Sequence, residues 1–244
     1  MILSDLTGAG ILITYYLVFT ALLPTILKVK LGVRMELVRK IQHIVYSLSI
    51  FLLLELFSTW YIAITAAFAL VILGYPVLML IEKTAWYRKT FVDRTQKGGE
   101  LRKQLIYVQL SFALLIAIFW GLFGIDWRYV IAVAIMAWGL GDAAAALVGK
   151  AFGRRRFIHA LIDKGKTYEG TIAMAVFAAL GIFFTLFAYW GQSWYVSLLI
   201  AVLVAPLCGV IELFSKRGID TLTVPISAAL TIMPLIYFFY WLGW

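Results

Sequence analysis

The sequence predicts an all-α membrane protein, a polytopic bundle of about eight transmembrane helices with both termini outside. Hydrophobic residues make up 64% of its 244 residues, well above the ~45–50% of a soluble domain. Apolar runs near the ~20 residues needed to cross a bilayer core recur along the chain. Basic residues gather in every second connection between these runs. An integral membrane protein with multiple spans is the fold class that explains all three features.

Each expected helix corresponds to one apolar run, and the second run is the shortest. The connections on the outer side are short, and no repeat or linker divides the chain, so we expect one integral membrane domain over residues 1–244. The first run lacks a preceding basic segment and a clear cleavage site, which predicts a retained span. The expected spans are residues 8–27, 41–57, 60–81, 104–123, 129–149, 171–190, 194–211 and 222–243.

Charge fixes the expected orientation of these spans. The connections after the first, third, fifth and seventh runs hold 20 of the 21 basic residues, and Arg128 is the exception. By the positive-inside rule these four connections are cytoplasmic. The longest of them, residues 82–103, has mixed charge and predicts a solvated loop or interfacial helix, with a substrate gate as the alternative.

The net charge of +9 does not indicate nucleic-acid binding, because the charge follows the topology and no basic segment with interleaved aromatics is present. Anionic lipid headgroups or a polyanionic cosubstrate are the expected partners of this charge.

Asp142 is the first candidate for chemistry. It lies about two turns inside the cytoplasmic end of the fifth expected span, where a carboxylate is costly unless it has a partner or water. Asp142 and Lys150 share a helical face, while Gly141, Ala145 and Gly149 form a stripe of small residues beside it. Such a stripe allows close packing within or between chains, so an oligomer stays open. A structural ion pair is the alternative role for Asp142.

The connection after this span is rich in cations and glycines that suit a triphosphate. Thr167 and Glu169 follow at the entry to the next helix. Positive-inside loops are basic in any case, so a purely topological role is the alternative. The candidate phosphate-binding residues are Gly149, Lys150, Gly153, Arg154, Arg155, Arg156, Lys164, Gly165, Lys166 and Gly170.

Further candidates lie at the cytoplasmic ends of other spans. Arg39 and His43 share a face at the start of the second span, although a lone histidine there is more often an interfacial hydrogen-bonded residue. Glu212 closes the seventh span and Asp220 precedes the eighth. With Asp142 and Glu169 they supply carboxylates at one membrane face, the hard oxygen ligands that Mg²⁺ prefers when it also holds phosphates.

In pattern and order, these clusters resemble the CTP-dependent polyprenol and lipid kinases, which include dolichol kinase, phytol kinase and yeast-type diacylglycerol kinase. The resemblance covers residues 39–225. Two positions depart from it, since Thr221 follows the aspartate where asparagine is common and Ala146 replaces a frequent polar residue. The matching pieces are Arg39-Lys40 with His43; Gly141-Asp142 with Ala145, Gly149 and Gly153; Lys166-Thr167-Tyr168-Glu169-Gly170; and Glu212 with Ser215, Gly218, Asp220, Val224 and Pro225.

The resemblance implies transfer of the γ-phosphate of CTP to a membrane isoprenoid alcohol or diacylglycerol. With it we expect Asp142, Lys166, Glu169 and Asp220 as catalytic residues, and Asp142, Glu212 and Asp220 as ligands of Mg²⁺. Arg39, His43, Gly141, Gly149, Lys150, Gly153, Lys164, Thr167 and Gly170 are expected to bind the nucleotide. A phosphatidate cytidylyltransferase and a membrane transporter are the two alternatives.

Overall fold

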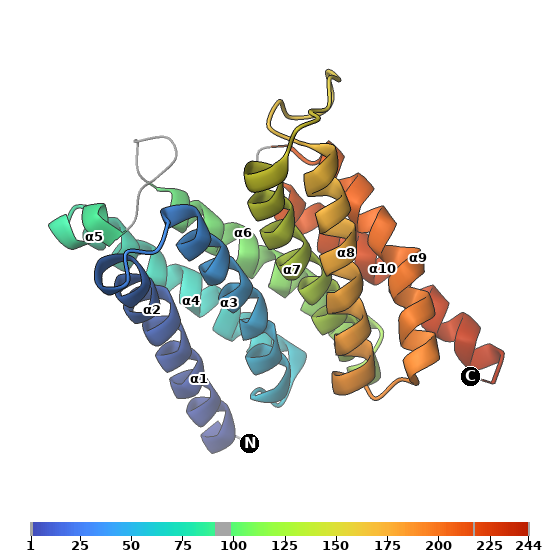
Figure 1. Cartoon of the computed structure of the whole chain (residues 1–244). Helices are drawn as coiled ribbons and strands as arrows, with labels where there is room; N and C mark the ends of the chain where they lie inside the picture. Colours follow the sequence, from blue (N-terminus) through green and yellow to red (C-terminus); the bar gives the residue numbers. More distant parts are fainter. Residues whose placement is uncertain (1, 91–98, 217, 244) are drawn as a thin grey trace. The chain divides into compact units, whose positions relative to one another are not determined.

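The computed structural model describes residues 2–90, 99–216 and 218–243, and the regular structure in these ranges is helical (Figure 1). Within these ranges, eight helices are long and apolar enough to cross a membrane, which confirms the expected fold class of an integral, multi-pass helical protein. They form two compact units, Met1–Gly121 and Leu122–Trp244. That the two units make one domain stays a prediction.

The first unit contains four of the long helices. The first is continuous through α1 (Ile2–Tyr16), a π-helical turn η1 (Leu17–Leu22), α2 (Leu23–Thr25) and η2 (Ile26–Lys30). It is followed by α3 (Met35–Glu55), α4 (Trp60–Ile81) and the short α5 (Ala85–Thr90). The fourth is α6 (Glu100–Leu115) with its π-helical extension η3 (Ile116–Leu122). Part of the expected loop or interfacial helix at 82–103 is therefore helical, and its residues 91–98 lie outside the described structure.

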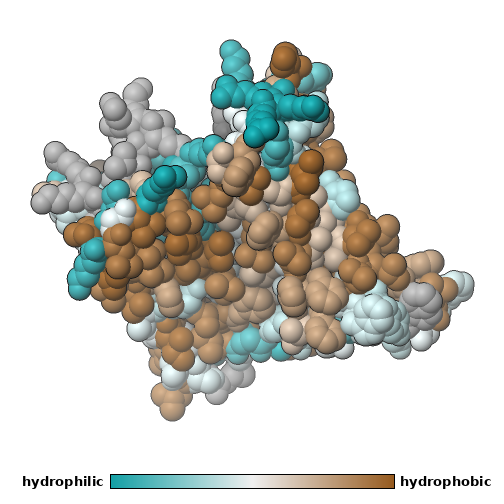
Figure 2. Space-filling view, viewed as in Figure 1, coloured by the Kyte–Doolittle hydropathy of each residue, from teal (hydrophilic) through white to brown (hydrophobic). Residues whose placement is uncertain are grey.

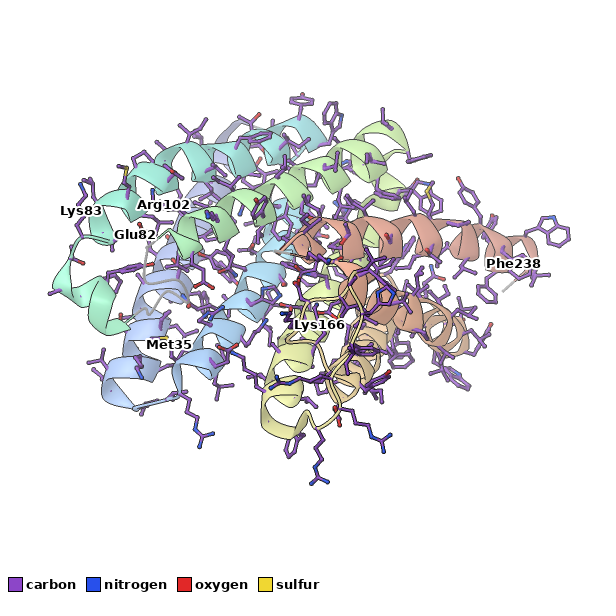
Figure 3. The ribbon with its side chains drawn as sticks, turned by 90° about the horizontal axis from the view of Figure 1, so that it is seen from above. Met35, Glu82, Lys83, Arg102, Lys166 and Phe238 are labelled. Atoms are coloured by element: carbon purple, nitrogen blue, oxygen red, sulfur yellow. The ribbon has the colours of Figure 1, made fainter. Side chains whose placement is uncertain are left out.

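Several polar groups inside the first unit are paired between helices. The Tyr16 hydroxyl is 2.8 Å from the Ser49 hydroxyl and accepts a hydrogen bond from Gln109 at 2.6 Å, which joins α1, α3 and α6. Arg102 donates to both carboxylate oxygens of Glu82 at 3.0 and 2.8 Å (Figure 3). Such pairing satisfies polar groups that the lipid cannot solvate.

The outer surface of the helices suits lipid. On α4, the side chains of Ile72, Leu73 and Leu80 are about two thirds exposed. Figure 2 shows hydrophobic residues over the flanks of the helices and hydrophilic residues gathered on the loop between α7 and α8. Exposed apolar side chains on a helix of this length are expected where the solvent is hydrocarbon.

The second unit consists of η4 (Ile125–Trp127), α7 (Arg128–Phe152), α8 (Tyr168–Phe184) with η5 (Thr185–Tyr189), α9 (Trp194–Phe214) and α10 (Asp220–Trp241). The α7 helix is its centre, because it packs against α8, α9 and α10 and all its residues from 130 to 139 are buried. It ends at Phe152, three residues beyond the expected end at 149. Asp142 is therefore ten residues from the helix end, or ~15 Å at 1.5 Å per residue.

Small residues let α7 and α8 pack closely. A Cβ atom on Gly141 would lie 2.5 Å from the Met174 sulfur, and one on Gly170 would lie 3.0 Å from the Ala145 carbonyl oxygen. A Cβ atom on Gly149 would be 3.0 Å from the Thr167 hydroxyl. The expected stripe of Gly141, Ala145 and Gly149 is thus confirmed as the α8-facing side of α7.

Candidate functional site

Three of the four sequence clusters meet at one end of the second unit. This end comprises the last turns of α7 and α9, the first turns of α8 and α10, and the loop of residues 153–167, which we call the basic loop. Figure 1 shows this loop rising from the ends of α7 and α8. Hydrogen bonds and an ion pair hold it against the neighbouring helices.

The basic loop folds back on itself at its two ends. Arg156 and Thr167 form an isolated antiparallel bridge. Beside this bridge, the Phe157 amide donates to the Lys166 carbonyl at 3.2 Å, and the Tyr168 amide donates to the Arg155 carbonyl at 3.1 Å. The rings of Phe157 and Tyr168 stack with their centroids 3.8 Å apart. The loop therefore has a paired stem, and residues 158–165 form its outer part.

Thr167 and Glu169 attach this stem to the start of α8. The Thr167 hydroxyl accepts a hydrogen bond from the Gly170 amide at 3.1 Å, so threonine is the N-cap of the helix. One Glu169 oxygen, Oε1, accepts from the amides of Arg154 and Arg155 at 3.1 and 3.3 Å. A carboxylate in the first turn also interacts favourably with the helix dipole.

The second Glu169 oxygen, Oε2, is buried and has no hydrogen-bond partner in the described part of the chain. A buried carboxylate oxygen without a donor is unfavourable. This atom is therefore a position where a cation or a donor from a ligand would be stabilised.

Glycines around the stem allow close packing, because a side chain at most of these positions would clash with its neighbours. A Cβ atom on Gly153 would lie 2.2 Å from the Gly149 carbonyl oxygen and 2.7 Å from the Thr167 methyl carbon. Gly149 and Gly170 are similarly close to Thr167, whereas a Cβ atom on Gly165 would meet nothing within 4 Å. Close packing is thus a role of Gly149, Gly153 and Gly170; their expected contact with a nucleotide stays a prediction.

Two lysines connect the basic loop to the segment around the end of α9. Lys166 (labelled in Figure 3) donates to the Glu212 carbonyl at 2.9 Å and also forms an ion pair with the Glu212 carboxylate. In the opposite direction, Lys216 donates to the Ala160 carbonyl at 2.8 Å. Beside these contacts, the hydroxyl of Ser215, which follows α9, lies 2.7 Å from the hydroxyl of Thr223 in α10.

The other cations of this end are directed outward. Their side chains are exposed, and they lie in the last turn of α7 and on the basic loop. They are Lys150, Arg154, Arg155, Arg156 and Lys164. The arrangement presents several exposed positive charges to an anion, and Lys166 is held by Glu212.

Asp142 and Asp220 lie at different depths of this unit. Asp142 is half-buried on α7, one residue after Gly141, which contacts Met174 of α8. Asp220 is half-buried and is the first residue of α10. The described residues contain no group of three or more His, Cys, Asp or Glu side chains placed to hold a metal ion. The expected ligand set of Asp142, Glu212 and Asp220 therefore stays a prediction.

Arg39 and His43 belong to the first unit. Arg39 forms an ion pair with Glu100 at 2.8 Å and a weaker one with Glu36 at 3.5 Å, and His43 is buried on the same helix. Sequence reasoning did not identify these two carboxylates. Glu36 precedes Arg39 by one helical turn, a spacing that signals such a pair, whereas Glu100 is too distant in sequence to leave a signal.

The chain is similar to a phytol kinase of Synechocystis sp., with 33% identity over 157 residues. The aligned segment covers 64% of this chain and 64% of that protein, so the chain spans less than two thirds of its relative. No family model matches the sequence. No solved structure matches it either.

Proposed function

We propose that the protein is a lipid-alcohol kinase that transfers the γ-phosphate of CTP to the hydroxyl group of a membrane isoprenoid alcohol, with phytol as the first candidate. One observation carries the proposal. The basic loop and the carboxylates of Glu169 and Glu212 meet at one end of a unit whose helices are long and apolar enough to span a membrane. The similarity of the chain to a phytol kinase supports a kinase reaction with an isoprenoid alcohol as the acceptor.

The exposed cations of the basic loop, together with Lys150 in the last turn of α7, suit the triphosphate. Arg154, Arg155 and Arg156 offer fork-like donors, and Lys150 and Lys164 offer point charges. The Glu169 side chain fixes the first two arginines through their amides and leaves their guanidinium groups outside. In this proposal the triphosphate binds along the stem of the loop.

The residues of this end fit a magnesium ion that is shared with the nucleotide. Such an ion needs one or two protein carboxylates, because phosphates and water complete its coordination. Glu169 Oε2, which has no hydrogen-bond partner in the described part of the chain, supplies one suitable oxygen. Asp142 lies ten residues inside the end of α7, too deep to share that ion, so we propose that it stabilises a cation separately. When bound, the ion neutralises negative charge on the phosphates. The Glu212 carboxylate is engaged by Lys166, so we leave it out of this ligand set.

The proposed reaction is a direct transfer. The alcohol oxygen forms a bond with the γ-phosphorus while the bond from that phosphorus to the β,γ-bridging oxygen breaks. The hydroxyl proton passes to a carboxylate, for which we propose Asp220 at the start of α10, and CDP leaves. Lipid monophosphate and CDP are the products, and the protein contributes alignment and charge stabilisation.

An assay of product identity tests this proposal. Purified protein in lipid micelles is given Mg²⁺, γ-labelled CTP or ATP, and phytol, a polyprenol, diacylglycerol or phosphatidate. We expect label in the alcohol and release of CDP, with phytol as the best acceptor. A CDP-lipid with released pyrophosphate would instead establish a cytidylyltransferase. Absence of turnover with every pair, together with solute uptake into sealed vesicles, would establish a transporter.

A further inference from the structure

The ion pair between Lys166 and Glu212 is anchored on one side by a buried carboxylate. The Glu212 side chain is 5% exposed at the end of α9, whereas that of Lys166 is 21% exposed at the end of the basic loop. Burying a carboxylate is unfavourable without a countercharge. Glu212 therefore stabilises the ammonium group of Lys166 at one defined position.

Lys166 is held at two points by the same residue. Its ammonium group donates to the Glu212 main-chain carbonyl at 2.9 Å as well as to the carboxylate. That carbonyl lies in the last turn of α9, where the helix dipole favours a cation. An ammonium group has three N–H donors, and in the described part of the chain these two hydrogen bonds are the ones that Lys166 makes through its side chain. One donor is left for a ligand.

We propose that Glu212 is a positioning residue, which holds Lys166 so that its third N–H donor meets a γ-phosphate oxygen of the nucleotide. This inference rests on the proposed kinase function. The ammonium group donates a hydrogen bond and transfers no proton, so the bonds made and broken are those of the phosphoryl transfer itself. A cation that is already oriented stabilises charge in the transition state without reorganising.

The alternative role for Glu212 is that of a metal ligand. A positioning residue must pair with Lys166, whereas a metal ligand must direct its carboxylate to the ion. A ligand oxygen must be available to the ion, but Glu212 Oε1 is engaged by Lys166. The described residues also place no third carboxylate, histidine or cysteine beside it to complete a group. The geometry therefore favours the positioning role.

A double-mutant cycle separates these roles. The variants are Lys166→Met, Glu212→Gln and the combination of both, each assayed with γ-labelled CTP and phytol over a range of Mg²⁺ concentrations. We expect Lys166→Met to lower kcat by about 100-fold and Glu212→Gln by about 10-fold, with KM for phytol unchanged. In the Lys166→Met background, Glu212→Gln should have almost no further effect. Glu212→Asp, which keeps the charge, should retain more activity than Glu212→Gln.

Two results would overturn the inference. One is an equal loss of kcat on Glu212→Gln in both backgrounds, and the other is a several-fold rise in the Mg²⁺ concentration needed for half-maximal activity. Either result would show that Glu212 acts independently of Lys166. Lys216→Met is the matched control, because it removes the other lysine that contacts this loop from the α9 side, and we expect less than about a threefold change in kcat.

Stability measurements keep the test decisive. Unfolding midpoints are measured for all variants. Loss of the Lys166 ammonium group beside the buried Glu212 carboxylate is expected to lower the midpoint of Lys166→Met, and removal of the carboxylate charge in the double variant is expected to raise it again. If Lys166→Met does not fold, Lys166→Arg with Glu212→Asp replaces it in the cycle. Wild-type protein without turnover would overturn the proposed function itself, whereas an active wild type with additive variants would overturn the role of Glu212 alone.

Discussion

At the scale of single residues, the chemistry depends on a few charges whose surroundings the fold determines. Asp142 lies ten residues inside the end of α7, beside a stripe of small residues that brings α8 close. Its position inside a membrane-grade helix is unfavourable for a carboxylate without compensation. We propose that Asp142 also stabilises a cation in the kinase reaction.

Replacement of Asp142 by Asn tests this assignment. We expect kcat for phosphoryl transfer to fall by about 100-fold or more, because the neutral amide no longer stabilises a cation. The comparison is made by initial rates at saturating Mg²⁺, with Asp126→Asn in η4 as the control. Near-normal turnover by folded Asp142→Asn would contradict the assignment.

Sequence reasoning identified these charged residues because charge is rare in an apolar chain and each one needs an explanation. It did not identify their partners. Lys166 and Glu212 are 46 residues apart, and Arg39 and Glu100 come together from α3 and α6. Side chains that are distant in the sequence leave no periodic signal, so the sequence predicts a metal-ligand role for Glu212 and gives no sign of its ion pair with Lys166.

At the scale of elements, α7, α8 and the basic loop form one closely packed assembly. The loop stem is attached to α8 by Thr167 and Glu169, and Gly153 leaves no space for a side chain. The eight spans and this small-residue contact could be predicted, since both follow from local spacing. The paired stem of the loop could not, because it depends on hydrogen bonds between residues 155–157 and 166–168.

Gly153→Ala tests the packing at the end of α7. Its new methyl group would clash with the Gly149 carbonyl and with Thr167, and such overpacking costs about 1–3 kcal/mol. The unfolding midpoint in detergent should fall accordingly. Gly165→Ala in the same loop meets no neighbour within 4 Å and should leave the midpoint nearly unchanged; equal midpoints for both variants would contradict this packing.

Glu169→Ala tests the attachment of the basic loop. Loss of the acceptor for the Arg154 and Arg155 amides should expose the stem, so that trypsin cleaves after Arg154, Arg155 or Arg156 several-fold faster. Limited proteolysis in proteoliposomes measures this rate. Asp163→Ala removes the same charge from the outer part of the loop and serves as the control. An unchanged cleavage rate in Glu169→Ala would show that this carboxylate does not hold the stem.

At the scale of the whole molecule, the distribution of charge predicts a single orientation in the membrane. The eight spans are confirmed as helices of sufficient length, and the basic connections alternate with short connections along the chain. The positive-inside rule then predicts that the basic loop is cytoplasmic, where it would meet a soluble nucleotide.

Labelling of single cysteines tests this orientation. In a Cys208→Ala background, Ile158→Cys replaces a side chain that is 99% exposed on the basic loop, and Gln192→Cys lies in the connection between η5 and α9. A membrane-impermeant maleimide added to intact cells should label position 192 and spare position 158 until the membrane is opened. The reverse pattern would place the basic loop outside.

The most direct test of the central claim is a paired reaction of the purified protein with phytol and CTP, labelled in one tube at the α-phosphate and in the other at the γ-phosphate. We predict that the γ label enters the lipid while the α label stays in CDP, and that both products are lost in Asp142→Asn. The α label in the lipid, or no transfer of either label to phytol, would contradict the account.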